Sequence, residues 1–297
     1  MGSSTGMVFA GAPLVVSSYT LGTEVGFSER VRAAAAAGFD GFGLRLENYH
    51  DAVASGLDDG AMRAIAEDGG VRVLEVEYLT GWGGDDAGTA RDERERTVLH
   101  MARVFGVGHV NAGLLEHLPT DVVTESFGRL CDRAGPDLVV ALEPMPYSGV
   151  RDLRVAWQVV RDAGRANGGL LVDVWHWARS GTTRADLADV PPDRIVSVQL
   201  CDVRAEPMEP LRAESLGYRL PPGRGCADAA GVIRALAAHG VRPRIVAVEV
   251  ISRDLVARGV DVAARTAADA AREVLRAASI TRSGTSGSSS PPGVCAP

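Results

Sequence analysis

Residues 138–174 read LVVALEPMPYSGVRDLRVAWQVVRDAGRANGGLLVDV, and this segment shows the pattern that recurs along the chain. It begins with an apolar run, Leu138–Glu143, continues with apolar residues at helical spacing over Leu153–Ala163, and ends in a second apolar run, Leu170–Val174. Short β-branched runs predict buried strands, and the spacing between them predicts a helix. A strand, a helix and a second strand in this order predict parallel strands joined by a right-handed crossover.

The same alternation continues in both directions along the chain. Six further apolar runs predict strands, at Leu14–Ser17, Gly41–Leu46, Val73–Tyr78, His109–Gly113, Ile195–Leu200 and Ile245–Val250. Helical spacing recurs between Ser28 and Gly38 and at Arg91–Phe105, Thr120–Ala134, Ala229–His239 and Val262–Ala277. Eight such units match a (β/α)8 barrel in number and size, so we predict an α/β fold with a single TIM barrel over residues 13–278.

The ends of the chain and the competing fold follow from composition and turn residues. Residues 1–12 are expected to form a leader, and residues 279–297, rich in Ser, Gly and Pro, a disordered tail. A doubly wound open sheet would normally carry a glycine fingerprint after its first strand. This chain has Ser17-Ser-Tyr-Thr-Leu-Gly22 there, which favours the barrel.

The charged residues exclude several function classes. All 31 cationic residues are arginine, so enzymes that need a lysine amine, such as Schiff-base aldolases and PLP enzymes, are excluded. The 38 acidic residues bring the net charge to −7, which argues against a nucleic-acid partner. No apolar run is long enough to span a membrane, and four cysteines without regular spacing argue against a disulfide scaffold. We therefore expect a cytoplasmic protein with neither a nucleic acid nor a membrane as partner.

Four of the predicted strands end in a side chain that carries a ligand oxygen. These residues are Glu143, Asp173, Gln199 and Glu249. A single acidic residue at a strand end is often a helix cap or a solvated charge. Four at the same relative place would converge at the mouth of a barrel, where its active site is assembled. Three carboxylates that meet there repel one another unless a cation neutralises them.

The donor set indicates the kind of metal. Two glutamates, one aspartate and one glutamine offer only oxygen, which suits Mg²⁺ or Mn²⁺, with Co²⁺ as a further option. We therefore expect one divalent cation, with room left on it for substrate oxygens.

Other polar and aromatic residues lie near the same predicted rim. His176 follows Asp173 by three residues and reaches the mouth only if the chain turns there; it would then act as a general acid or base. The candidates for substrate binding share a position at strand ends or in the loop 203–224: Glu77, Tyr78, Trp175, Arg204 and Arg219. For each of them a purely structural role is the alternative.

At these residues the chain resembles the xylose isomerase-like TIM-barrel superfamily over residues 13–278. The motifs that carry the resemblance are Ala-Leu-Glu143-Pro, Val-Asp173-Val-Trp-His176, Val-Gln199-Leu-Cys-Asp202 and Ala-Val-Glu249-Val. The resemblance implies a single divalent cation on four such residues, with His176 contacting substrate. Many ketose epimerases of this superfamily carry histidine at the position of Gln199. A glutamine there is similar to the hydroxypyruvate isomerase, inosose dehydratase and 3-dehydroshikimate dehydratase branches. Tyr218-Arg-Leu-Pro-Pro-Gly-Arg-Gly225 resembles a family loop and favours Arg219 as the substrate arginine, although Arg224 stands where an acidic residue is common.

The chemistry implied by the resemblance is proton abstraction next to a carbonyl. We expect an isomerase or epimerase of a polyhydroxy-keto substrate that works through a metal-stabilised enediolate, with His176, Glu143 or Glu249 as the base. A dehydratase or another β-eliminating lyase, acting on a keto-cyclitol, keto-sugar or 3-dehydroshikimate-like substrate, is the alternative. A barrel that binds a ligand without turnover is a third hypothesis, which the complete ligand set disfavours. The resemblance also suggests a homodimer.

Overall fold

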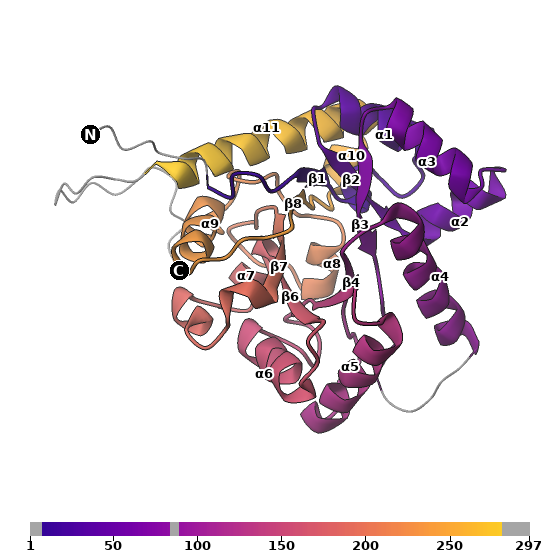
Figure 1. The fold of residues 1–297 in the computed structure, drawn as a ribbon. Coiled ribbons are helices and arrows are strands. Elements are labelled where there is room, and N and C mark those ends of the chain that lie inside the picture. The colour runs from indigo at the N-terminus through magenta and orange to yellow at the C-terminus, as the bar shows by residue number, and fades with distance from the viewer. Residues whose placement is uncertain (1–7, 84–88, 281–297) are drawn as a thin grey trace, which may run out of the picture.

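The structure, a computed structural model, describes residues 8–83 and 89–280, and eight parallel strands form its centre (Figure 1). The strands are β1 Leu14–Val16, β2 Gly41–Arg45, β3 Arg72–Glu77, β4 His109–Ala112, β5 Val139–Leu142, β6 Gly168–Asp173, β7 Ile195–Leu200 and β8 Ile245–Val248. They are ordered β3-β2-β1-β8-β7-β6-β5-β4 in the sheet. Each lies within the predicted apolar run or within two residues of it, so the predicted barrel is confirmed.

The barrel closes between its two outermost strands, β3 and β4. Just beyond the end of β3, the amide of Leu79 donates to the carbonyl of Asn111 at 2.9 Å, and the amide of Gly113 donates to the carbonyl of Leu79 at 3.0 Å. This parallel bridge lies at the carboxyl ends of the strands. It therefore fixes the rim on which the polar residues lie.

Helices surround the strands (Figure 1). They are α1 Phe27–Ala36, α2 Leu46–Ala54, α3 Asp59–Asp68, α4 Thr89–Phe105, α5 Thr120–Ala134, α6 Leu153–Ala163, α7 Val174–Arg179, α8 Leu211–Ser215, α9 Ala229–Ala238, α10 Arg253–Val256 and α11 Val260–Ser279. Single 3-10 turns lie at η1 Ser18–Thr20, η2 Arg184–Leu187 and η3 Pro192–Arg194. The outward-facing strand residues pack against these helices in one large apolar core.

The interior of the barrel has an apolar floor and a polar upper layer. Two small buried clusters form the floor, one of Val15, Ile245 and Ala247 and the other of Ala141, Leu171 and Val196. Because side chains alternate along a strand, the residue two positions after an inward-facing one also faces inward. Glu143, Asp173 and Glu249 follow Ala141, Leu171 and Ala247 in this way and form the upper layer above the floor.

The ends of the described chain meet beside α11. The amide of Val8 donates to Ser279 Oγ at 2.8 Å. The rest of the expected leader and tail, residues 1–7 and 281–297, lies outside the described residues. Cys131 and Cys201 are buried free thiols. Among the described helices, none has the length and apolar character needed to cross a membrane.

Candidate functional site

Three carboxylates converge at the carboxyl ends of β5, β6 and β8. Oxygen atoms of Glu143, Asp173 and Glu249 lie within 4.8 Å of one another, and all three residues are buried. Gln199 pairs with Asp173 in the register of β6 and β7 and is 2% exposed. The four residues predicted as metal ligands thus come from the ends of four successive strands, with Gln199 beside Asp173 in the sheet.

Gln199 presents an oxygen that the described protein leaves without a partner. Its Nε2 donates to Glu75 Oε1 at 3.1 Å and lies 3.4 Å from Glu77 Oε1. Its Oε1 is buried and accepts no hydrogen bond within the described residues. Leaving a buried amide oxygen unpaired is costly, and a metal ion would satisfy it. Together with three carboxylates it makes an all-oxygen set that fits a divalent cation.

Arg219 lies against the carboxylates, with 2% of its side chain exposed. One guanidinium nitrogen, Nη1, donates to Asp173 Oδ2 at 2.7 Å and to Glu249 Oε2 at 2.9 Å. The carbonyl and hydroxyl of Ser215 hold the other two nitrogens at 2.9 and 3.0 Å. The predicted substrate arginine is therefore at the site, where it carries positive charge toward two of the three acids.

The charges shift the pKa values of these acids in opposite directions. Burial alone would raise the pKa of Asp173, but Arg219 and His176 outweigh it, so the pKa of Asp173 lies below its ordinary value. Burial raises the pKa of Glu249 well above its ordinary value; Arg219 opposes this rise, and repulsion from Glu77 and Glu143 adds to it. Asp173 thus holds its negative charge more firmly than Glu249, which holds a proton more readily.

His176 reaches the mouth because the chain turns directly after β6. Asp173 ends the strand and caps α7, its Oδ1 accepting from the backbone amide of His176 at 3.0 Å. This turn places His176 Nε2 at 3.3 Å from Glu143 Oε1 and at 3.4 Å from Arg219 Nη2. The chain therefore makes the turn after Asp173 that His176 needs to reach the mouth.

Tyr78 and Glu77 each contact a different predicted metal ligand, Tyr78 contacting Glu143 and Glu77 contacting Gln199. The Tyr78 hydroxyl donates to Glu143 Oε2 at 2.6 Å. Burial and the neighbouring carboxylate raise the pKa of this phenol well above its ordinary value, so it remains a proton donor. Glu77 accepts from Arg45 Nη1 at 3.2 Å and is buried beneath the mouth.

The remaining predicted residues lie farther from the carboxylates. Trp175 is fully buried behind His176, with ring centroids 5.0 Å apart, and its indole donates to Glu214 Oε1 at 3.2 Å. Arg204 is exposed, and its backbone carbonyl accepts from Arg179. The structure thus gives Trp175 a supporting place and does not bring the Arg204 side chain to the carboxylates in the described protein.

Asp202 holds the loop that carries Arg219. Its Oδ1 accepts from the amides of Val203 at 2.9 Å and Ala227 at 2.8 Å, and it pairs with Leu220 in an antiparallel bridge. Asp202 therefore anchors both ends of the loop and does not join the ligands.

Several polar residues of the site, most of them buried, were not predicted from the sequence. Glu75, Asn111, Arg45 and Glu214 lie beneath or beside the mouth and contact the predicted residues or one another. Glu75 lies two residues before Glu77, so the alternation of the strand could have placed it inside the barrel. Its partners on other strands could not be read from one chain segment.

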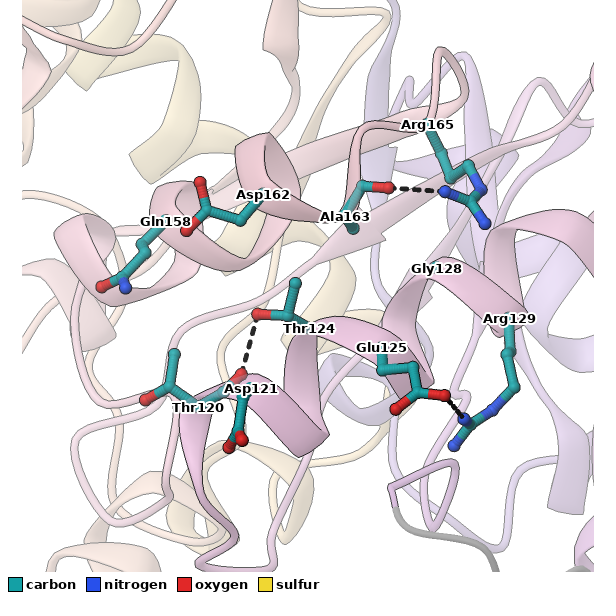
Figure 2. Close-up of a pocket in the computed structure, with 10 residues that line it drawn as sticks. All are labelled: Thr120, Asp121, Thr124, Glu125, Gly128, Arg129, Gln158, Asp162, Ala163 and Arg165. Atoms are coloured by element: carbon teal, nitrogen blue, oxygen red, sulfur yellow. Dashed lines mark hydrogen bonds and ion pairs between the residues drawn. The ribbon is translucent and has the colours of Figure 1, made fainter.

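A groove of about 580 Å³ lies elsewhere, between α5 and α6 on the outside of the barrel (Figure 2). Its arginines are paired with acids: Arg129 with Glu125 at 2.7 Å, and Arg165 with Asp132 at 2.7 Å. It contains none of the residues predicted to act in the site.

Known proteins with related sequence or fold include enzymes. The 3-dehydroshikimate dehydratase of Pseudomonas aeruginosa is 28% identical over 233 residues, which cover 72% of this chain and 34% of that protein. The chain thus spans about a third of the length of that curated relative.

Solved structures resemble the chain over most of its length. The IolI protein with a bound zinc atom superposes with a TM-score of 0.79 at 18% identity, covering 89% of this chain and 98% of that one. The probable 3-DHS dehydratase AsbF of Bacillus anthracis gives 0.69 at 12% identity, over 86% and 97%. At such low identity these likenesses concern the fold. A family model described as a xylose isomerase-like TIM barrel matches residues 31–278, and the chain belongs to that family.

Proposed function

We propose that this protein is a divalent-metal-dependent enzyme that removes a proton next to the carbonyl group of a polyhydroxy-keto substrate. The observation that carries the proposal is the buried meeting of Glu143, Asp173 and Glu249 at the carboxyl ends of their strands. On the neighbouring strand, Gln199 Oε1 is buried and has no hydrogen-bond partner among the described residues. A cation bound there would polarise a substrate carbonyl and stabilise the negative charge that develops on it.

The protein's own residues supply the proton path. Glu143 has two proton carriers beside it, the Tyr78 hydroxyl at 2.6 Å and His176 Nε2 at 3.3 Å. Glu249 is instead tied to Arg219 at 2.9 Å. We therefore assign the proton transfer to Glu143 and His176, with Tyr78 holding a proton near Glu143. Arg219 lies against Asp173 and Glu249, where it would hold a substrate oxygen.

The fate of the substrate after proton removal separates the two enzyme classes. Loss of a β-hydroxyl as water gives a dehydratase, and return of the proton to another carbon or face gives an isomerase or epimerase. We place elimination first because the curated relative and one similar fold carry dehydratase names. The isomerase or epimerase expected from the sequence remains the second candidate, supported by the family description.

Solvent exchange in D2O tests the proposal. The full chain is incubated with Mn²⁺ and keto-polyols, including 3-dehydroshikimate, and products are followed by mass spectrometry and NMR. Loss of water from the substrate would support the dehydratase, and deuterium on carbon in a product of unchanged composition would support the isomerase. Neither change with any substrate, in protein shown to bind the metal, would favour the non-catalytic binding barrel. Glu143→Gln should abolish either reaction, while Glu125→Gln on the outer wall serves as the matched control.

A further inference from the structure

The orientation of the Gln199 amide is decided by the carboxylate behind it. An amide carries a donor on one side and an acceptor on the other, and a rotation of 180° exchanges them. Here the Nε2 side faces Glu75 Oε1 at 3.1 Å, so the Oε1 side faces the opposite way, without a partner in the described protein. If the amide rotated, Gln199 Oε1 would face Glu75 Oε1, and the Nε2 donor would take the place of the ligand oxygen. Only one orientation therefore offers a ligand oxygen.

Glu75 is itself held rigidly in the centre of the barrel. It is fully buried, and Ser17 Oγ donates to its Oε2 at 2.7 Å, while Asn111 Nδ2 donates to its Oε1 at 3.0 Å. Gly43 leaves the space for this carboxylate, because a Cβ at that position would lie 2.8 Å from Glu75 Oε2. Residues of β2 and β4, together with Ser17 directly after β1, thus place this one acceptor.

Glu77 is less suited to this role. It lies 3.4 Å from Gln199 Nε2, and its other oxygen accepts from Arg45 at 3.2 Å. The shorter contact and the greater number of partners both single out Glu75.

We propose that Glu75 is a positioning residue of the metal centre, which holds Gln199 with its oxygen toward Glu143, Asp173 and Glu249. This inference rests on the proposed function, because it assumes that a metal binds there. Partners that orient metal ligands typically change metal affinity by about 10- to 100-fold when they are removed. Removal of the Glu75 acceptor should weaken the metal by a similar factor, but only while Gln199 is present.

The experiment is a double-mutant cycle read out by Mn²⁺ binding. Electron paramagnetic resonance measures free Mn²⁺ in titrations of the chelator-treated full chain, and thermal melts establish that each variant is folded. Glu75→Met removes the acceptor at similar length and should weaken Mn²⁺ binding about 10- to 100-fold. The same change in a Gln199→Ala chain should have less than about a twofold effect. Glu75→Gln, which keeps an acceptor oxygen, should remain within about threefold of the wild type.

A reciprocal swap keeps the inference testable if Glu75→Met does not fold. Gln199→Glu sets two carboxylates against each other, and adding Glu75→Gln restores a donor between the two side chains. We expect this second change to improve Mn²⁺ affinity at least about tenfold in the Gln199→Glu chain while leaving the wild-type background nearly unchanged.

The outcomes separate the inference from the proposed function. Wild-type protein that does not bind Mn²⁺ would overturn both. If the wild type binds Mn²⁺, two results would overturn the role of Glu75 alone. One is an equal loss of Mn²⁺ affinity from Glu75→Met in the wild-type and Gln199→Ala chains. The other is no gain in Mn²⁺ affinity when Glu75→Gln is added to the Gln199→Glu chain.

Discussion

Arg219 shows how a single residue sets the charge of the site. Its guanidinium is buried and contacts both Asp173 and Glu249, so it offsets part of the repulsion among three carboxylates. A divalent cation would offset the same repulsion. The two cationic groups therefore act on the same acids, and removal of one should increase the effect of the other.

Replacement of Arg219 tests this relation. In the metal-free protein, Arg219→Met should lower the stability by about 3 kcal/mol, because breaking a buried ion pair leaves charges without compensation. The rise in melting temperature on adding saturating Mn²⁺ should be larger for this variant than for the wild type. Arg224 lies on the same loop as Arg219, and Arg224→Gln removes its exposed ion pair with Glu273. This change should have little effect on the stability or on the rise in melting temperature with Mn²⁺. An equal or smaller Mn²⁺ effect in Arg219→Met would refute the relation.

From the sequence, one could predict which residues lie at the barrel mouth but not the buried contacts behind them. Glu143, Asp173, Gln199 and Glu249 each end an apolar run, and this repeated position is visible in the chain itself. Glu75 lies within a strand, and its contact with Gln199 joins residues 124 positions apart. Such a contact depends on the order of strands around the barrel and on register, which no local pattern gives.

At the scale of elements, the loop between β7 and α9 presents Arg219 to the site. The short helix α8 lies within it and was not predicted, because five residues show no helical period. Glu214 in α8 is fully buried and fixes the loop to the barrel. It accepts from Trp175, from Arg179 Nε at 3.0 Å and from the amide of Met208 at 2.7 Å.

Removal of Glu214 should loosen this loop. Glu214→Ala leaves the largely buried Arg179 without its acid, so we expect a loss of about 3 kcal/mol and faster cleavage by trypsin after the exposed Arg204 and Arg212. Limited proteolysis with mass spectrometry locates the cuts. Glu206→Ala changes an exposed acid on the same loop and provides the control. Cleavage at wild-type rates in Glu214→Ala would show that Glu214 does not restrain the loop.

The longer elements were predicted closely, and the differences have local causes. Helices α5 and α6 and strand β7 begin and end at the predicted residues. Strand β6 begins at Gly168, two residues early, because Gly168 and Gly169 continue the pairing with Val140 and Ala141. It ends at Asp173 because that side chain caps the next helix.

For the molecule as a whole, we expect the buried His109 to make the barrel less stable in acid. His109 begins β4 on the same face as Asn111 and is 1% exposed. Its Nε2 has no hydrogen-bond partner in the described protein. Burial, aided by Arg244, lowers the pKa of His109 from 6.5 to about 4.

This depressed pKa predicts the direction of a pH effect. Between about pH 6.5 and 4 the unfolded chain binds a proton at His109 that the folded chain does not, so stability falls as the pH drops through this range. The contribution amounts to about 3 kcal/mol. Urea unfolding measures the free energy of unfolding at pH 7 and pH 4.5. The difference between these two values should be smaller for His109→Leu than for the wild type. The exposed His50→Gln is the control, and an unchanged difference in His109→Leu would contradict the account.

We propose that four residues at the carboxyl ends of β5 to β8 hold one divalent cation. Titration calorimetry of the chelator-treated full chain with Mn²⁺, Mg²⁺ and Zn²⁺, together with elemental analysis, measures this binding. We predict one ion per chain and an affinity at least about tenfold weaker in Glu249→Gln, with no change in the exposed control Glu273→Gln. Binding well below one ion per chain, or an affinity unaffected by Glu249→Gln, would contradict the claim.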